Sequence, residues 1–455
     1  MPQSLSTEQM KRVLQLSLPM ALSRFLQMFS GFISTMMVSH LGPLVLASCA
    51  LIGATNATVL LIFISIVFSL SFIVGQSFGA KKYDEVGALV QQAMMLSLFL
   101  GFAMMICFWF VDDVLRWFHE KEALVIYVRD YFHMLMWGAV AILLQSCLEQ
   151  FCYGVLKQRL VITINFISLC IGIPIAYLLI FGKGGFPALG VRGLALTFAI
   201  QSWFNFTVLL ICCYRMPYFK PFKLFHRRSA QNWIYLKKIF RIGWPMSVQF
   251  GGELGAFFVM TMMIGWLGAD ALGAVQVTQQ WMYLVVVPIF AMAEAASILV
   301  GQSVGAKDYE KLRLINRSSL WLSLGLIGVL DIGFIFFPHF FASFYMNVNQ
   351  IHNTHIMQLV PPLFMLMAVT LIFNTIRDVV TGSLRGLFDT QFPMRVGLLV
   401  MWCLVLPLGY CFAFPLHMNV IGFRLGSNIG LCVGAVIIYW RWIKKEAHTR
   451  EYSSK

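Results

Sequence analysis

Charged residues are scarce in this chain. Only 11% of its 455 residues are Asp, Glu, Lys or Arg, whereas soluble domains carry about 25%. This scarcity excludes an ordinary globular protein, because a water-exposed surface needs many more charges. Apolar residues fill the chain instead: they make up 59% of it and give a mean hydropathy of +0.79. We therefore expect an integral membrane protein.

Paired cysteines are also missing. The ten cysteines lie in or at the ends of apolar runs and none belongs to a CxxC pair, so the sequence predicts neither structural disulfides nor a zinc site. No metal-ligand cluster, nucleophile elbow or phosphate loop is visible in the sequence either. These observations argue against an enzyme and against a bound cofactor.

Long apolar runs cover most of the chain. A spanning helix needs about 20 mostly apolar residues, and by that rule the sequence predicts an all-α polytopic membrane protein with twelve transmembrane helices. The expected spans are 15–39, 45–78, 88–111, 127–153, 160–181 and 190–213 in the first half, and 241–266, 271–304, 315–338, 354–386, 392–415 and 420–442 in the second.

The two halves repeat one another. The segment VGQSFGAKKY at 74–83 returns as VGQSVGAKDY at 300–309, and two shorter pairs keep the same register. A period near half the length indicates a duplicated unit. Because each half has an even number of spans, both copies enter from the same side, which predicts two six-helix lobes related by pseudo-two-fold symmetry. Gly79 and Gly305 are expected to end their helices in a left-handed conformation.

The net charge of +14 reflects topology. Of the 33 Lys and Arg residues, 25 lie in the termini and the even-to-odd loops, and the positive-inside rule makes these parts cytoplasmic. Arg24 and Arg377 fall inside expected spans, and nucleic-acid binding is poorly supported. The predicted organisation is an N-lobe at 1–213, a cytoplasmic basic linker at 214–240 that lies along anionic headgroups, a C-lobe at 241–443 and a cytoplasmic tail at 444–455.

Ionisable residues inside spans are costly and mark ion or substrate paths in transporters. Most of them lie in the second half: Glu253, Glu294, Asp331, Arg377 and Asp378. Glu253 is the leading candidate for chemistry, because three neighbouring glycines allow a helix or an ion to approach it. Glu294 and Asp331 have plainer interpretations as an inter-helix hydrogen-bonding group and a structural acid, and Glu149 in the first half is likewise expected to be structural.

The span that contains Arg377 carries a polar stripe. Asn374, Arg377 and Asp378 belong to it, at helical spacing. As sequence neighbours on a helix, Arg377 and Asp378 point about 100° apart and need not pair with each other. Arg377 could instead form a structural ion pair with Glu253 or Glu294, as an alternative to a role in ion coupling.

The first span carries a similar stripe without a carboxylate. It consists of Ser23, Gln27, Ser30 and Ser34, with Arg24 in the same span. The register of the repeated loops places Gln27 opposite Glu253, so the halves share a polar position but only one of them is acidic there.

With these features the chain resembles the multidrug and toxic compound extrusion (MATE) family, most closely its NorM-like bacterial branch. The resemblance covers essentially the whole chain and rests on Leu18-Pro19-Met20, Leu41-Gly42, the two repeated loops and Gly382-Ser383-Leu384-Arg385-Gly386. It implies twelve spans in two lobes, the bacterial cytoplasmic (inner) membrane, and export of amphipathic, often cationic compounds driven by inward Na+ or H+.

Carried over by residue, the span 7 acid of NorM-like members falls on Glu253, and the span 10 acid falls on Asn374, with Asp378 one turn further on. The first-span aspartate of many members falls on Ser34. This departure moves the expected coupling chemistry to the second lobe.

The resulting hypothesis assigns cation coupling to five residues. Glu253, supported by Asp378, Asn374, Thr370 and Gln279, alternates between binding a cation and a drug-competent state. A Na+ site would use Glu253, Asp378 and Asn374, whereas H+ would need only the glutamate, and the sequence leaves this choice open. Substrate is expected in a cleft between the lobes lined by Phe and Met, which adapt to varied apolar shapes. Membrane lipids are expected partners, and the protein is expected to be a monomer.

Two other functions remain open on the sequence. A lipid-linked saccharide flippase of the same superfamily would be favoured by a strongly cationic cavity. A non-transporting membrane scaffold or receptor is disfavoured because the chain has no sizeable soluble domain.

Overall fold

The structure, a computed structural model, describes residues 3–224, 233–345 and 354–451, and helices joined by short connections make up most of this part. The first half contains α1 (Gln3–Ser39), α2 (Pro43–Gly79), α3 (Tyr83–Trp109), α4 (Val111–Trp117), α5 (Glu122–Gly154), α6 (Gln158–Phe181), α7 (Val191–Arg215) and the short 3-10 helix η1 (Pro217–Phe222). The second contains α8 (Trp233–Gly265), α9 (Ala269–Gly305), α10 (Glu310–Phe336), α11 (Pro338–Ser343), α12 (Thr354–Gly386), α13 (Gln391–Leu399), the π-helical segment η4 (Val400–Val405), α14 (Leu406–Ala413) and α15 (Asn419–Glu451).

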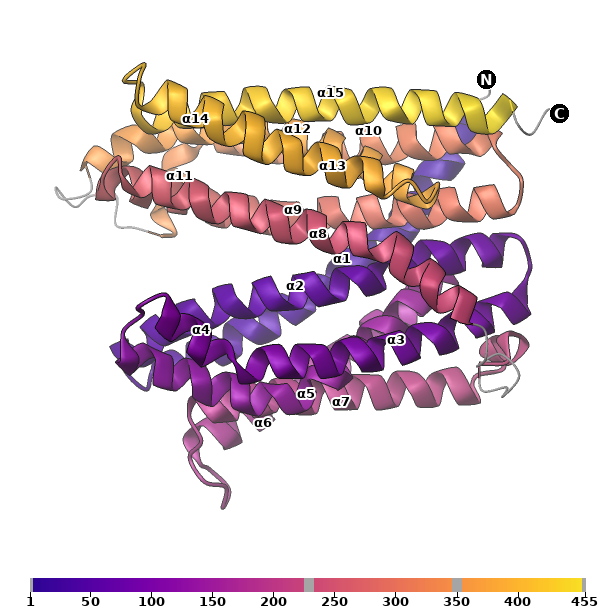
Figure 1. Cartoon of the computed structure of the whole chain (residues 1–455), viewed down its shortest axis with the longest axis horizontal. Helices are drawn as coiled ribbons and strands as arrows, with labels where there is room; N and C mark the ends of the chain where they lie inside the picture. The colour runs from indigo at the N-terminus through magenta and orange to yellow at the C-terminus, as the bar shows by residue number, and fades with distance from the viewer. Residues whose placement is uncertain (1–2, 225–232, 346–353, 452–455) are drawn as a thin grey trace. The chain divides into compact units, whose positions relative to one another are not determined.

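The expected twelve-helix membrane fold is confirmed. Eleven segments of the described residues are long and apolar enough to cross a membrane, with 391–413 counted as one span made of α13, η4 and α14. The 37-residue α1, which contains the first expected span at 15–39, is the remaining long helix. Helices α4 and α11 are short connections at equivalent places in the two halves. Figure 1 shows α2, α3, α5, α6 and α7 (indigo to magenta) packed side by side, and likewise α9, α10, α12 and α15 (orange to yellow).

The repeated loops have the same backbone in both copies. Helices α2 and α9 each have 37 residues and end at Gly79 and Gly305. The expectation that these glycines are left-handed was wrong: the left-handed residues are Lys81 and Lys307, each with φ 58°. The following amide closes the turn in each copy, since Lys82 N donates to Ser77 O at 3.0 Å and Asp308 N to Ser303 O at 2.9 Å. This bond pattern puts the left-handed position two residues after the glycine.

The register between the copies changes along the chain. Helices α2 and α9 end at Gly79 and Gly305, and α5 and α12, which both have 33 residues, end at Gly154 and Gly386. The chain between these two helix ends is longer in the second copy than in the first. Residue pairs in α5 and α12 are therefore matched by counting back from their closing glycines.

The described residues pack as two units that do not follow the midpoint of the chain. The first unit is Leu22–Ser247, and the second unit is Met1–Ala21 with Val248–Lys455. Helix α8 therefore belongs to both units: its residues up to Ser247 pack in the first unit, and those from Val248 onward in the second.

The first part of α8 is held tightly on α2 inside the first unit. The Ser247 hydroxyl donates to Ile62 O at 2.6 Å, and the Ser69 hydroxyl reaches Ile239 O at 3.4 Å. A Cβ at Gly243 would overlap the backbone of Ile66, so α8 and α2 meet there in a close approach that requires glycine.

The described start of the predicted linker is also packed on the first unit. Phe219 and Phe222 of η1 are buried, the Tyr218 hydroxyl donates to Val155 O at 2.9 Å, and Lys223 pairs with Asp84 at 3.0 Å. Residues 225–232 of the predicted linker and 452–455 of the predicted tail lie outside the described residues. The predicted lobe boundaries stay predictions.

Candidate functional site

Charged side chains of α8 and α12 form one network in the second unit. Arg377 Nη2 lies 3.4 Å from Glu253 Oε2 and 3.1 Å from Asp378 Oδ1. The side chains of Arg377 and Glu253 are only 9% and 10% exposed. Arg377, whose partner the sequence left open, thus pairs with both acids, because its long side chain bends back so that Nε also donates to Asp378 at 3.1 Å.

Two further polar groups extend this network along α8 and α12. Gln249 Nε2 donates to Glu253 Oε1 at 3.0 Å, and Arg385 Nη2 donates to Gln249 Oε1 at 3.1 Å. Both side chains are buried. The network thus joins two acids and two arginines, which balances its formal charge, and a cation that binds Glu253 must compete with Arg377.

Glycines let a third helix approach Glu253. A Cβ on Gly397 of α13 would stand 3.0 Å from Glu253 Oε1, and a Cβ on Gly252 of α8 would overlap the Leu398 side chain. The Trp402 indole, in η4, donates to Gly252 O at 3.1 Å. The close helix approach expected from the glycines beside Glu253 is present, and it occurs at the end of α13, directly before the π-helical segment η4. Such segments are frequent at functional sites.

The other expected coupling residues lie elsewhere in the second unit. Thr370 and Asn374 line a pocket of about 20 Å³ together with Arg424 and three methionines, Met260, Met282 and Met401. Arg424 Nη2 donates to Gln279 Oε1 at 3.2 Å, and the Thr370 hydroxyl donates to Asn428 Oδ1 at 2.6 Å. The five predicted coupling residues therefore fall into two groups, around Arg377 and around Arg424.

Glu294 and Asp331 lie on other helices of the second unit, α9 and α10. Glu294 is buried in α9 next to Ala293, whose backbone meets Gly382 of α12. Asp331 is 5% exposed in α10, and neither carboxylate oxygen has a hydrogen-bond partner among the described residues.

The sequence undercounted the buried arginines. Arg385 and Arg424 are 9% and 4% exposed and lie inside α12 and α15, although the sequence singled out only Arg24 and Arg377. Helix α12 continues to Gly386, and α15 begins at Asn419, so both arginines belong to helices.

The first unit contains a cavity of about 570 Å³ with a carboxylate in its wall. Glu149 Oε1, from α5, accepts hydrogen bonds from three amides: Gln145 at 2.9 Å, Gln27 at 3.4 Å and Asn165 at 3.4 Å. Gln27 is therefore the point where the stripe of α1 meets an acid.

Some of the other residues in the polar stripe of α1 also line this cavity or bond to residues in its wall. Asn165 Nδ2 also donates to the Ser23 hydroxyl at 2.6 Å, and Gln201 Nε2 donates to the Ser30 hydroxyl at 3.3 Å. Arg24 and Ser30 line the cavity, and the Arg24 guanidinium lies 5.4 Å from the centroid of the Phe68 ring. Ser34 is buried in α1 and is not part of the cavity wall.

Glu149 is the functional candidate that the sequence passed over. The stripe of α1 seemed to lack an acid because the acid lies far along the chain, on α5. One signal was present: the sequence Gln145-Ser146-Cys147-Leu148-Glu149-Gln150 places an amide and an acid at i, i+4 in an apolar span.

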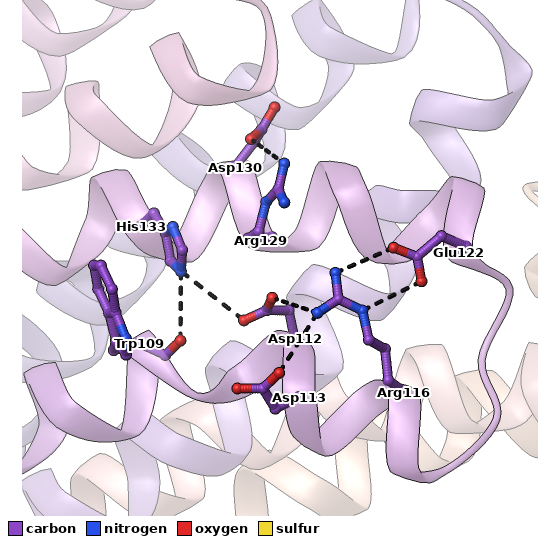
Figure 2. A network of polar contacts seen from close by, with 8 residues as sticks. All are labelled: Trp109, Asp112, Asp113, Arg116, Glu122, Arg129, Asp130 and His133. Atoms are coloured by element: carbon purple, nitrogen blue, oxygen red, sulfur yellow. Dashed lines mark hydrogen bonds and ion pairs between the residues drawn. The ribbon is translucent and has the colours of Figure 1, made fainter.

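A second polar network ties α4 to α5 in the first unit. Figure 2 shows Arg116 between three carboxylates: Asp112 at 3.2 Å, Asp113 at 3.5 Å and Glu122 at 3.1 Å. The hydrogen bond to Glu122 is the main cause that raises the pKa of Arg116, so its charge is retained. His133 of α5 stacks on Trp109 with ring centroids 4.7 Å apart.

Comparison with known proteins decides the family. The profile of the MatE family matches residues 19–178 and 245–411 of this chain. The chain belongs to the MatE family. Both sites lie within the matched segments, Glu149 in the first and the Glu253–Arg377–Asp378 network in the second.

Individual MatE relatives match over nearly their whole length. A probable multidrug resistance protein NorM from Synechococcus sp. is 25% identical over 96% of this chain and 94% of that protein. Among solved structures, a MATE transporter in the bent conformation superposes with a TM-score of 0.89 at 18% identity, covering 99% of this chain and 98% of that one. The eukaryotic MATE transporter AtDTX14 gives a TM-score of 0.83 at 20% identity, covering 99% and 100%. The resemblance seen in the sequence is confirmed.

Proposed function

We propose that this protein is a secondary active exporter of amphipathic organic cations, driven by inward Na+ or H+ through alternating access. The observation that carries the proposal is the cavity of the first unit. Its volume of about 570 Å³ lies in the range of small-molecule sites, and its wall holds Glu149 together with aromatic rings such as Phe68 and Tyr131. A carboxylate and aromatic faces both attract an organic cation.

Multidrug export is supported by relatives as well as by the cavity. The Synechococcus relative and many similar proteins carry the name of a probable multidrug resistance protein NorM. The positive-inside distribution of Lys and Arg supports a cytoplasmic membrane location with both termini in the cytoplasm.

Coupling is assigned to the second unit. With Glu253 ionised, Arg377 holds α12 against α8 through one guanidinium shared by two acids. When a proton or Na+ binds the Glu253 carboxylate, Asp378 is the remaining ion-pair partner of Arg377, and it lies on the same helix, α12. The ion pair that links α8 to α12 is then lost.

Helix α8 supplies a physical route for that change. Its first part is held on α2 by Ser247 and by the close approach at Gly243, and its later part carries Glu253. A shift of α8 that follows the loss of the Glu253–Arg377 contact is therefore transmitted along one continuous helix into the first unit, which holds the cavity.

The buried arginines give little support to the flippase alternative. A cationic cavity would suit a lipid-linked phosphate, but Arg377 and Arg385 are balanced by Glu253 and Asp378 in the same network. Arg24 shares its cavity with Glu149.

The test is transport in proteoliposomes that contain a fluorescent organic cation. An imposed Na+ or pH gradient should drive the cation across the membrane with wild-type protein, and the effective gradient identifies the coupling ion. Glu253→Gln should abolish the gradient dependence, whereas Asp308→Asn, which removes an exposed carboxylate of the second unit, should not. Unchanged gradient-driven transport in Glu253→Gln would overturn the coupling site, and absence of transport in wild-type protein would favour the flippase or a scaffold.

A further inference from the structure

A groove with excess positive charge lies on the first unit between α5 and α7, separate from the Glu149 cavity. Its volume is about 390 Å³, and its lining residues are Arg129, Asp130, His133, Met134, Trp137 and Arg192. Six residues from two helices thus bring together two guanidiniums, one carboxylate, one imidazole and two apolar side chains.

The two arginines share a single acid. Asp130 Oδ1 lies 2.9 Å from Arg192 Nη2 and 3.8 Å from Arg129 Nη2. The side chains of Arg192 and Arg129 are 51% and 38% exposed, so a ligand can reach both guanidiniums. With one carboxylate for two guanidiniums, the groove keeps a positive charge and unused N–H donors, which suits an anion.

Nearby acids do not cancel this charge. Figure 2 shows Asp112, Asp113 and Glu122 turned toward Arg116, which they hold on the α4 side of the network. Asp112 also faces His133, 3.9 Å from Nε2. Of the described acids, Asp130 is the one that pairs with Arg129 and Arg192.

The groove runs from charged to apolar along α5. Arg129, His133 and Trp137 follow at i, i+4 and i+8 and therefore line one face, with steps of about 6 Å. Trp137 is 62% exposed, and its carbonyl accepts a hydrogen bond from the Trp203 indole of α7 at 3.0 Å. Arg192 is the second residue of α7 and so marks the end of that span.

This order matches the outer half of a bilayer. The proposed orientation puts the start of α7, with Arg192, on the extracytoplasmic side, where arginines meet headgroup phosphates, and places Trp137 deeper, near the middle of α5. Basic pockets between transmembrane helices bind anionic headgroups on the cytoplasmic side, and the same pairing of guanidinium with phosphate applies in the outer leaflet. A free phosphate would use the arginines but would leave the exposed Trp137 face without an occupant.

We propose that this groove binds an anionic glycerophospholipid of the outer leaflet, with its phosphate at Arg129 and Arg192 and an acyl chain along Trp137. Asp130 holds the two guanidiniums in place and limits the affinity, since it competes with the phosphate for the same donors. The inference goes beyond the proposed export activity and needs only its membrane orientation.

The test uses purified protein in detergent, titrated with phosphatidylglycerol or phosphatidylcholine of the same acyl chains, with bound lipid counted by native mass spectrometry. We expect preferential binding of phosphatidylglycerol. Arg129→Gln/Arg192→Gln should lower that affinity by about tenfold or more, because each basic residue near the surface contributes to attraction of anionic lipid. Asp130→Asn should raise the affinity, since it frees both guanidiniums. Lys183→Gln, which removes an exposed charge from the α6–α7 connection outside the groove, is the matched control and should bind as wild type.

Opposite signs for the arginine and Asp130 variants distinguish lipid binding from a structural role, which would weaken both. Equal binding of the two lipids, or unchanged binding in the double arginine variant, would overturn the proposal. If inorganic phosphate displaces phosphatidylglycerol at equal concentration, the site takes a free anion and the lipid assignment is wrong. Should the double variant fail to fold, Arg129→Gln and Asp130→Asn alone still give the required contrast.

Discussion

In the first unit, Glu149 of α5 accepts hydrogen bonds from Gln145 on its own helix and Gln27 on α1. In the second unit, Glu253 of α8 faces Arg377 on α12. Gln145 and Arg377 are equivalent, because each stands equally far before the closing glycine of its helix. Gln27 and Glu253 are equivalent by the register of the repeated loops. The duplicated scaffold thus keeps its polar positions while exchanging amides for an acid and an arginine.

The space around the two sites differs as much as their chemistry. The first unit has a cavity of about 570 Å³ beside Glu149, and the second has a pocket of about 20 Å³ beside Asn374. The larger space admits an organic molecule, whereas the smaller one holds about one water. We infer a division of labour, with substrate in the first unit and ion coupling in the second.

The largest effect is expected for Arg377→Gln. It leaves Glu253 and Asp378 without the guanidinium that they share, and breaking a buried ion pair in this way costs about 3–5 kcal/mol. Thermal unfolding in detergent should show a clear loss of stability. Adding Glu253→Gln to this variant should restore part of it, since one uncompensated charge is removed. A single variant as stable as wild type would show that the ion pairs of this network do not stabilise the second unit.

A smaller effect is expected for Glu149→Gln. The side chain keeps its size but loses its charge, so affinity for an organic cation should fall about tenfold or more, as measured by fluorescence titration. Asp308→Asn serves as the control, because it removes an exposed acid outside the cavity. Unaltered affinity would place the substrate elsewhere.

A modest effect is expected where α8 is held on α2. Ser247→Ala removes the hydroxyl that donates to Ile62 O and should destabilise the protein by about 1 kcal/mol. Gradient-driven transport should slow more than substrate binding weakens, because the contact anchors α8, the helix that carries Glu253, and lies outside the cavity wall. Equal losses in binding and transport would contradict that role.

The smallest effect is expected in the repeated loops, where the two copies have the same backbone conformation. Lys81→Gly and Lys307→Gly each relieve a left-handed lysine, and glycine's entropy cost offsets part of the gain, so each should stabilise by about 0.5 kcal/mol. Thermal melting should give the same small shift for both. A large difference between them would show that the repeated loops have diverged.

The fold was predictable because its signals are local. Apolar runs long enough to cross a bilayer define the spans, and the repeated loop at 74–83 and 300–309 fixes the duplication. The position of the left-handed turn was missed, because the glycine at 79 suggests the turn while the hydrogen bonds place it at Lys81.

Contacts within the candidate sites could be predicted from the sequence only where both residues lie on the same helix. Gln249 and Glu253 stand at i, i+4 in the sequence, a spacing that brings side chains together on a helix, and the structure contains their hydrogen bond. The Gln27–Glu149 contact joins two helices that are distant along the chain, and no helical spacing reveals such a pair. Gln279 and Thr370 were grouped with Glu253 only because they are polar. In the structure, Gln279 accepts a hydrogen bond from Arg424, and Thr370 donates one to Asn428.

The central claim is best tested by measuring substrate binding and gradient-driven transport side by side in Glu149→Gln and Glu253→Gln. The account predicts that Glu253→Gln binds the organic cation with nearly wild-type affinity but no longer responds to the ion gradient. It predicts that Glu149→Gln binds the cation weakly while the transport that remains still depends on the gradient. The reverse pattern, with binding lost in Glu253→Gln and gradient dependence lost in Glu149→Gln, would contradict the division between the two units.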